Sequence, residues 1–124
     1  MSKSRASRVA YVDVDNTLLR KVAGEEIPDP DVIELVRRLK RRGARLYCWS
    51  TGGAAHARRA ALKCRIASLF EGFLSKPNLL LDDEPVSEWP DCHEVSPTDD
   101  RRAIDASVKA LAKRSSKEAN WRSK

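Results

Sequence analysis

The chain has 124 residues, of which 34% are charged and 41% hydrophobic, as expected for one globular domain. Lys and Arg outnumber Asp and Glu by 24 to 18, so the formal net charge is +6. Three cysteines without a CxxC pair argue against a disulfide framework or a zinc knuckle and favour the cytoplasm. The longest stretch without a charged residue or His, 46–55, is too short to span a bilayer, and residues 1–5 do not lead into a signal peptide.

The chain begins with a polar segment and then a short apolar run. We expect residues 1–7 to form a flexible basic N-terminus. Residues 9–12 are apolar, partly β-branched and followed by polar residues, a pattern typical of a buried strand. Residues 18–28 contain Gly24 and several charged side chains, and this segment is predicted to be a loop.

The clearest helix pattern starts after this loop. Asp29 can cap the helix, Pro30 suits its first position, and the apolar residues that follow recur with a period of 3.6. Gly43 is a suitable end point. Beyond it we expect a second strand at residues 45–49 and a helix at 54–64.

The second half of the chain gives shorter patterns. We expect three further strands, at residues 69–74, 78–81 and 92–95. Thr98 can cap a last helix, with Asp99 and Asp100 in its first turn. Apolar residues recur on one face of this helix: Ile104, Val108 and Leu111.

Strands that alternate with helices through short connections predict an α/β fold. The expected architecture is a three-layer, Rossmann-like parallel sheet of about five strands, flanked by helices. We expect a single domain over residues 8–113, followed by a polar basic tail over 114–124.

Polar side chains follow three of the predicted strands. They are Asp13 and Asp15, Ser50 and Thr51, then Asp82 and Asp83, while Lys76 precedes the fourth strand. Binding sites of parallel sheets lie at the carboxyl ends of the strands, so these groups are expected to converge. Clustered carboxylates repel one another and require a cation, and all-oxygen ligation favours Mg²⁺.

In this order, the groups resemble the motifs of the haloacid dehalogenase-like superfamily of phosphohydrolases. Asp13, Asp15 and Thr17 have the spacing of its first motif, Ser50 or Thr51 matches the second, Lys76 the third, and Asp82 with Asp83 the fourth. The resemblance implies a nucleophile at Asp13 that forms an aspartyl-phosphate, and a general acid and base at Asp15. It also implies that phosphate is bound by Ser50 or Thr51, Gly52 and Lys76, and that Mg²⁺ is bound by Asp13, Asp15 and either Asp82 or Asp83.

Most members of that superfamily carry a cap domain over the site. The segments 18–29 and 54–75 are too short to hold one, so the resemblance implies a small, capless member. An open site suits a macromolecular phosphate, or a small phosphorylated metabolite if a second subunit of a homo-oligomer completes the site.

The sequence therefore predicts a magnesium-dependent phosphatase. Two alternatives are a catalytically weak or inactive binding or regulatory protein of the same fold, and a nucleic-acid-binding protein that uses its basic ends. Residues 13–100 carry 13 basic and 16 acidic side chains, so the positive charge lies at the two ends. This distribution disfavours nucleic acid as the main partner.

Three other residues have simpler expected roles. Trp49 is expected to pack in the core rather than line the pocket. Cys48 is expected to be a small core residue, and His56 is expected to face solvent.

Overall fold

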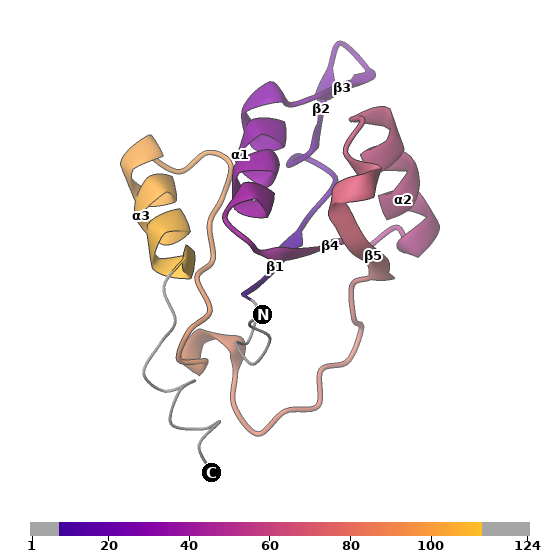
Figure 1. Ribbon diagram of the computed structural model, residues 1–124. Helices are drawn as coiled ribbons and strands as arrows, with labels where there is room; N and C mark the ends of the chain where they lie inside the picture. Colours follow the sequence, from indigo (N-terminus) through magenta and orange to yellow (C-terminus); the bar gives the residue numbers. More distant parts are fainter. Residues whose placement is uncertain (1–7, 113–124) are drawn as a thin grey trace. The chain divides into compact units, whose positions relative to one another are not determined.

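A computed structural model describes residues 8–112 of the chain (Figure 1). These residues form two compact units, 8–77 and 78–112. The segments predicted as a basic N-terminus, 1–7, and as a basic tail, 114–124, lie outside the described residues. Within residues 8–112, no helix combines the length and the apolar composition needed to cross a membrane.

A parallel sheet of three strands organises the unit 8–77. In spatial order, the strands are β1 (Val9–Val12), β4 (Arg45–Ser50) and β5 (Phe70–Ser75). Burial alternates along the central strand β4: Leu46, Cys48 and Ser50 are buried, whereas Tyr47 and Trp49 are half-buried. This period of two gives the sheet one core face and one partly open face. The α/β class and the parallel strands are confirmed.

The predicted first helix is present as α1 (Pro30–Arg41). The buried carboxylate of Asp29 accepts hydrogen bonds from the backbone N–H groups of Asp31 and Val32, at 3.0 and 3.3 Å. Arg20 Nε donates to the same carboxylate at 2.6 Å. Burial acts to raise the pKa of Asp29, but the hydrogen bonds from Arg20, Val32 and Asp31 outweigh it, so this pKa lies below 3.8.

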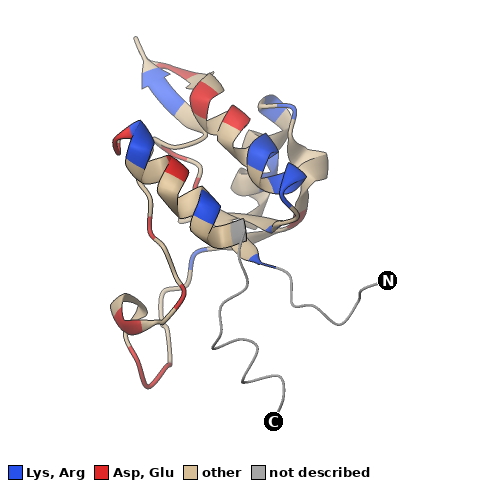
Figure 2. Ribbon diagram, turned by 60° about the vertical axis from the view of Figure 1, so that its left-hand side comes forward, with Lys and Arg blue, Asp and Glu red and all other residues tan. Residues whose placement is uncertain are grey.

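The charges of α1 also match its direction. In Figure 2, the ribbon of α1 is red near its start, where acidic residues lie, and blue toward its end, where basic residues lie. This distribution complements the helix dipole. On the core side, α1 buries Val32, Val36 and Leu39.

The second helix, α2 (Ala54–Lys63), also matches its prediction. Ala57, Ala60 and Ala61 are buried, and α2 packs against β4 and β5. These small side chains allow the helix to approach the sheet closely. A short 3₁₀ helix, η1 (Ala67–Leu69), leads from α2 into β5.

The segment 18–28 is not the predicted loop. It forms an antiparallel hairpin of β2 (Leu19–Val22) and β3 (Glu25–Pro28). The connecting residues Ala23 and Gly24 both have positive φ values, 52° and 82°. Two central residues of this kind define a tight turn whose twist matches that of the paired strands.

The unit 78–112 contains a 3₁₀ helix, η2 (Val86–Glu88), and the helix α3 (Arg101–Ala112), and none of its described residues forms a strand. The strands predicted at 78–81 and 92–95 are therefore wrong, and so is a sheet of about five strands. Leu79 and Leu81 are 82% and 95% exposed. An apolar run alone does not make a strand, because a strand also needs a neighbour to pair with.

The predicted last helix is confirmed as α3, although its start differs. Asp100, rather than Thr98, receives the hydrogen bond of the first turn, from the backbone N–H of Arg102 at 2.8 Å. Ile104 and Val108 are buried, as the apolar spacing predicts.

Candidate active site

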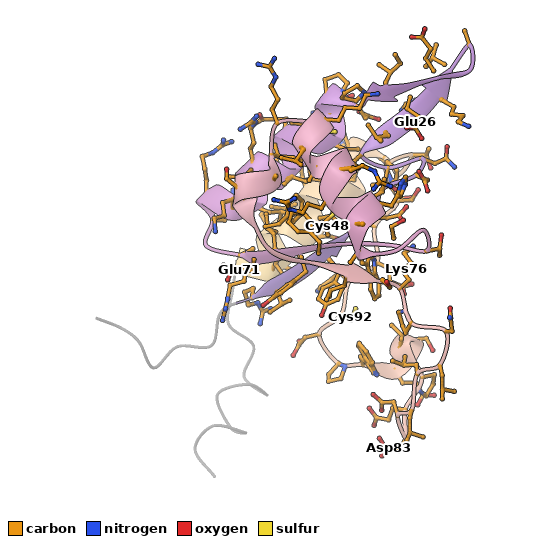
Figure 3. The ribbon with its side chains drawn as sticks, turned by 90° about the vertical axis from the view of Figure 1, so that its right-hand side faces the viewer. Glu26, Cys48, Glu71, Lys76, Asp83 and Cys92 are labelled. Carbon is orange, nitrogen blue, oxygen red and sulfur yellow. The ribbon has the colours of Figure 1, made fainter. Side chains whose placement is uncertain are left out.

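The carboxyl ends of the three parallel strands bring three predicted site residues together. Asp13 follows β1, Ser50 ends β4, and Lys76 follows β5. Lys76 Nζ lies 3.0 Å from Asp13 Oδ1, and each of these side chains is about one-third exposed. The backbone N–H of Lys76 also donates to the carbonyl oxygen of Ser50 at 2.9 Å. Figure 3 shows Lys76 at one end of β5 and Glu71 at the other.

In the loop after β1, buried apolar residues flank a more accessible segment, 15–17. Val14 and Leu18 are fully buried. Thr17 Oγ1 donates to Asp13 Oδ2 at 3.0 Å. Asn16 has a φ of 64°, in the left-handed region that Asn tolerates better than most residues. The two oxygens of Asp13 are thus fixed by one cation and one hydroxyl group.

The loop from β4 to α2 is held by hydrogen bonds of its own. Ser50 is buried, and its hydroxyl oxygen accepts from the backbone N–H of Gly52 at 2.9 Å. The N–H of Gly53 donates to the carbonyl oxygen of Ser50 at 3.1 Å. Thr51 is exposed. Both glycine N–H groups are therefore engaged within the loop.

The start of α2 adds free donors to this edge of the sheet. No side chain of the described residues caps α2, and its first turn holds no acidic residue. The first N–H groups of a helix lack partners inside the helix and attract anions. The N-terminus of α2, which has no side-chain cap among the described residues, therefore follows the same end of β4 that lies beside Asp13 and Lys76.

Trp49 lies beside Lys76 rather than in the core. Lys76 Nζ is 5.7 Å from the centre of the Trp49 ring. The Tyr11 ring contacts Trp49 edge to face, with centroids 4.7 Å apart. The prediction of core packing for Trp49 is wrong, because odd-numbered residues of β4 point to the partly open face.

His56 is a site residue that the sequence analysis missed. Its Nε2 lies 3.3 Å from Asp15 Oδ1, so it does not simply face solvent. His56 is the third residue of α2, and α2 begins at the edge of the sheet where Asp15 lies. Its place three residues after Gly53 was the available signal, because a first-turn side chain of α2 can reach this edge.

Asp82 and Asp83 belong to the unit 78–112 and are exposed. Asp82 Oδ1 accepts from the backbone N–H of Glu84 at 3.0 Å and so closes a local turn. Their approach to Asp13 stays a prediction. Among residues 8–112, no group of three or more His, Cys, Asp and Glu side chains is arranged to hold a metal ion.

Cys48 lies in the core close to Asp13, where a thiolate would be unfavourable. Burial, together with the nearby charge of Asp13, raises the pKa of the Cys48 thiol to about 12. Cys48 Sγ lies 3.8 Å from the carbonyl oxygen of Ala57, and Figure 3 shows this residue inside the unit. Cys48 is the small core residue that its place in the strand predicts.

The fold and this edge define an α/β protein with a carboxylate and an ammonium group at the ends of parallel strands. Residues 2–93 match the family described as "Protein of unknown function (DUF705)", and the chain belongs to this family. No curated protein and no solved structure matches the chain.

The family match corrects the resemblance inferred from the motifs. The chain belongs to DUF705, and nothing in the comparisons points to the haloacid dehalogenase-like superfamily, so the assignment to a small capless member of it is wrong. The error has a physical origin. Each motif is only one to three polar residues long, and polar residues at strand ends occur in many parallel sheets.

Proposed function

We propose that this protein is a phosphohydrolase that works through a phosphorylated Asp13. The observation that carries the proposal is the carboxylate of Asp13, held by Lys76 at 3.0 Å and by Thr17 at 3.0 Å at the carboxyl edge of a parallel sheet. A carboxylate fixed beside a cation can attack a phosphoryl group while the cation offsets the charge of that group.

Asp13 and Asp15 would divide the chemistry between them. A carboxylate oxygen of Asp13 forms a bond to phosphorus as the bond to the leaving oxygen breaks, and Asp15 gives its proton to that oxygen. Asp15 then takes a proton from water as the water oxygen attacks phosphorus. This second step breaks the bond from Asp13 to phosphorus, releases inorganic phosphate and restores both carboxyl groups.

Phosphate binding would fall to the groups around Asp13. Lys76 supplies a compact positive charge, and the start of α2 supplies backbone donors. The hydroxyl group of Ser50 accepts from Gly52 and keeps its own proton available as a donor. Thr51 is the accessible alternative, because its side chain is exposed whereas Ser50 is buried.

Mg²⁺ is part of the proposal. A carboxylate oxygen of Asp13 and the backbone carbonyl oxygen of Asp15 would be the hard oxygen ligands that this ion prefers, and Asp15 is exposed, so a hydrated ion can reach this loop. Mg²⁺ often binds through one or two carboxylates together with water and substrate phosphate, so the residues of this edge fit it. The bound ion would neutralise charge on the phosphoryl group.

The exposure of Asp15 also bears on the substrate. An accessible general acid suits either a bulky phosphorylated macromolecule or a small phosphorylated metabolite covered by a second subunit. Both remain within the same proposed reaction, because the attacking and protonating groups are the same.

The test is hydrolysis of 4-nitrophenyl phosphate with added Mg²⁺, by the full chain and by the variant Asp13→Asn. We expect turnover that a chelator abolishes, that Asp13→Asn lacks, and that the control Asp31→Asn on α1 retains. Mass spectrometry after acid quenching should find a phosphoryl group on Asp13. Absence of turnover across phosphorylated metabolites, nucleotides and phosphopeptides would overturn the proposal.

A further inference from the structure

The imidazole of His56 contacts the carboxylate of Asp15 across the edge of the sheet. Nε2 lies 3.3 Å from Oδ1, although the two residues are 41 positions apart in the chain. The His56 side chain is 27% exposed and the Asp15 side chain 53% exposed. From this contact we propose that His56 is a positioning residue for Asp15 in the reaction proposed above, on which this inference rests.

The loop before α2 is shaped to admit the imidazole. A Cβ atom built on Gly52 would lie 3.1 Å from His56 Cδ2 and 3.2 Å from Cγ, closer than most Cβ contacts. The ring therefore lies directly against the backbone of Gly52, in space that any other residue would reduce. Gly52 N–H also donates to Ser50 Oγ, which fixes the loop beneath the ring.

The chemistry of the two groups fixes the direction of the hydrogen bond. With the exchangeable proton of Asp15 on Oδ2, the Oδ1 atom can only accept, so Nε2 of the proposed pair donates to Oδ1. This bond occupies one oxygen of Asp15 and leaves Oδ2 to exchange the proton with the leaving group and with water. Asp15 is half-exposed, and the bond restrains a carboxylate that would otherwise rotate in solvent.

A positioning role predicts losses that depend on the leaving group. An alkyl alcohol must be protonated as it leaves, whereas 4-nitrophenolate leaves without a proton. The value of kcat/KM reports the steps up to departure of the leaving group. His56→Ala should therefore lower kcat/KM for glycerol phosphate by roughly 10- to 100-fold, the weight of a hydrogen bond to a charged group.

For 4-nitrophenyl phosphate, the same variant should keep kcat/KM within about twofold of the unmodified chain. His56→Gln should restore most of the loss on glycerol phosphate, because its amide nitrogen can donate from nearly the same place as Nε2. Equal losses on the two substrates would show a merely structural role and overturn the inference, as would no loss on either.

A substitution at Gly52 gives a second test of the position of the His56 ring. Gly52→Ala should displace the ring and lower kcat/KM more for glycerol phosphate than for 4-nitrophenyl phosphate, although its Cβ, 3.4 Å from Ser50 Oγ, should lower turnover of both substrates. Combined with His56→Ala it should add little to this difference between the substrates, because both substitutions remove one contact. Independent, additive contributions of the two substitutions to this difference would contradict the proposed coupling.

A measurement that does not depend on catalysis can test the contact between His56 and Asp15 separately from the proposed function. The chain has two histidines, so nitrogen-15 NMR of the imidazole rings can follow His56, with His93→Gln to assign the signals. Asp15→Asn should shift the ring signals of His56 and leave those of His93 in place. Unchanged His56 signals would overturn the inference even if the chain hydrolyses phosphate. A shift in a chain that hydrolyses no phosphate would establish the contact, overturn the proposed function and, with it, the catalytic role of His56.

Discussion

The ammonium group of Lys76 lies 5.7 Å from the ring centre of Trp49, while its nitrogen also pairs with Asp13. A flexible lysine chain is thereby restrained between an aromatic ring of β4 and a carboxylate that follows β1. This restraint links the position of the positive charge to the packing of the open sheet face. Two predictions concern it.

Lys76→Met should lower kcat by roughly 100-fold, a loss comparable with that of one donor that stabilises a transition state. The methionine keeps much of the length of the side chain but removes the charge. Steady-state kinetics on 4-nitrophenyl phosphate would measure the effect, with the exposed Lys63 changed to Met as the matched control. A variant as active as the control would show that Lys76 does not act on the phosphoryl group.

Trp49→Leu should have a smaller effect on the same assay. A cation–π contact at an accessible site contributes about 0.5–1 kcal/mol, so the loss of kcat should be about two- to fivefold. Tyr47→Leu is the matched control, since Tyr47 occupies the same face of β4 two residues earlier. Equal losses in the two variants would mean that general packing, rather than contact with Lys76, matters.

Asp29 should contribute to stability in a pH-dependent way. Asp29→Ala removes the helix cap and should cost about 1–2 kcal/mol in the free energy of unfolding at pH 7, measured by urea denaturation. Because the folded-state pKa of Asp29 lies below the ordinary value of 3.8, its contribution is present above pH 3.8 and is lost as pH falls through the folded value.

The matched comparison for this pH effect is Asp29→Asn, which keeps a capping oxygen but cannot ionise. Between pH 6 and pH 3, the unmodified chain should lose more stability than this variant. Parallel curves for the two proteins would contradict the lowered pKa of Asp29.

Thiol reactivity should distinguish the three cysteines. Cys92 is exposed, whereas Cys48 and Cys64 are buried. Burial raises the pKa of both buried thiols, that of Cys48 to about 12, so little Cys48 thiolate exists near pH 8. A thiol reagent at pH 8 should modify Cys92 first, and Cys48 and Cys64 only after unfolding. Peptide mass spectrometry would assign the sites, and rapid labelling of Cys48 in the folded chain would contradict its burial.

Leucine substitutions test the segment that was wrongly predicted as a strand. Leu81 is 95% exposed and Leu46 is fully buried in β4. Leu81→Ala should change the free energy of unfolding by less than about 0.5 kcal/mol, whereas Leu46→Ala should cost about 2–5 kcal/mol. A large cost at Leu81 would show that this residue packs in a core after all.

The elements that the sequence predicted well are those whose signals are local. The cap at Asp29 and the apolar period after it define α1, and the short apolar run before Asp13 defines β1. The hairpin was missed because Ala23 is an unusual residue at a positive φ, where Asn or Gly is the ordinary signal. The strand expected at Leu79 failed because pairing depends on a neighbouring strand, which an apolar run does not reveal.

The same distinction applies to the candidate site. Asp13 and Lys76 were expected to converge, but Lys76 was placed before a strand at 78–81 that is not present; the two side chains meet because Lys76 follows β5, whose carboxyl end shares an edge with that of β1. The contact of His56 with Asp15 could not be predicted in this way. The start of α2 was predicted, but the contact also depends on the space that Gly52 leaves for the imidazole, which is a property of the assembled loop.

Each strand-end residue of the site inherits its position from the pairing of its strand. Val12 is aligned with Cys48, and Ser50 with Ser75, so Asp13 and Lys76 each come one residue after a fixed partner. A slip of one residue would exchange the two faces of the strand and turn Asp13 toward the core. The apolar alternation that stabilises the sheet therefore also fixes the strand register, and the register sets the distance between the reactive groups. Evolution of this edge would have to proceed by substitutions rather than by insertions within the strands.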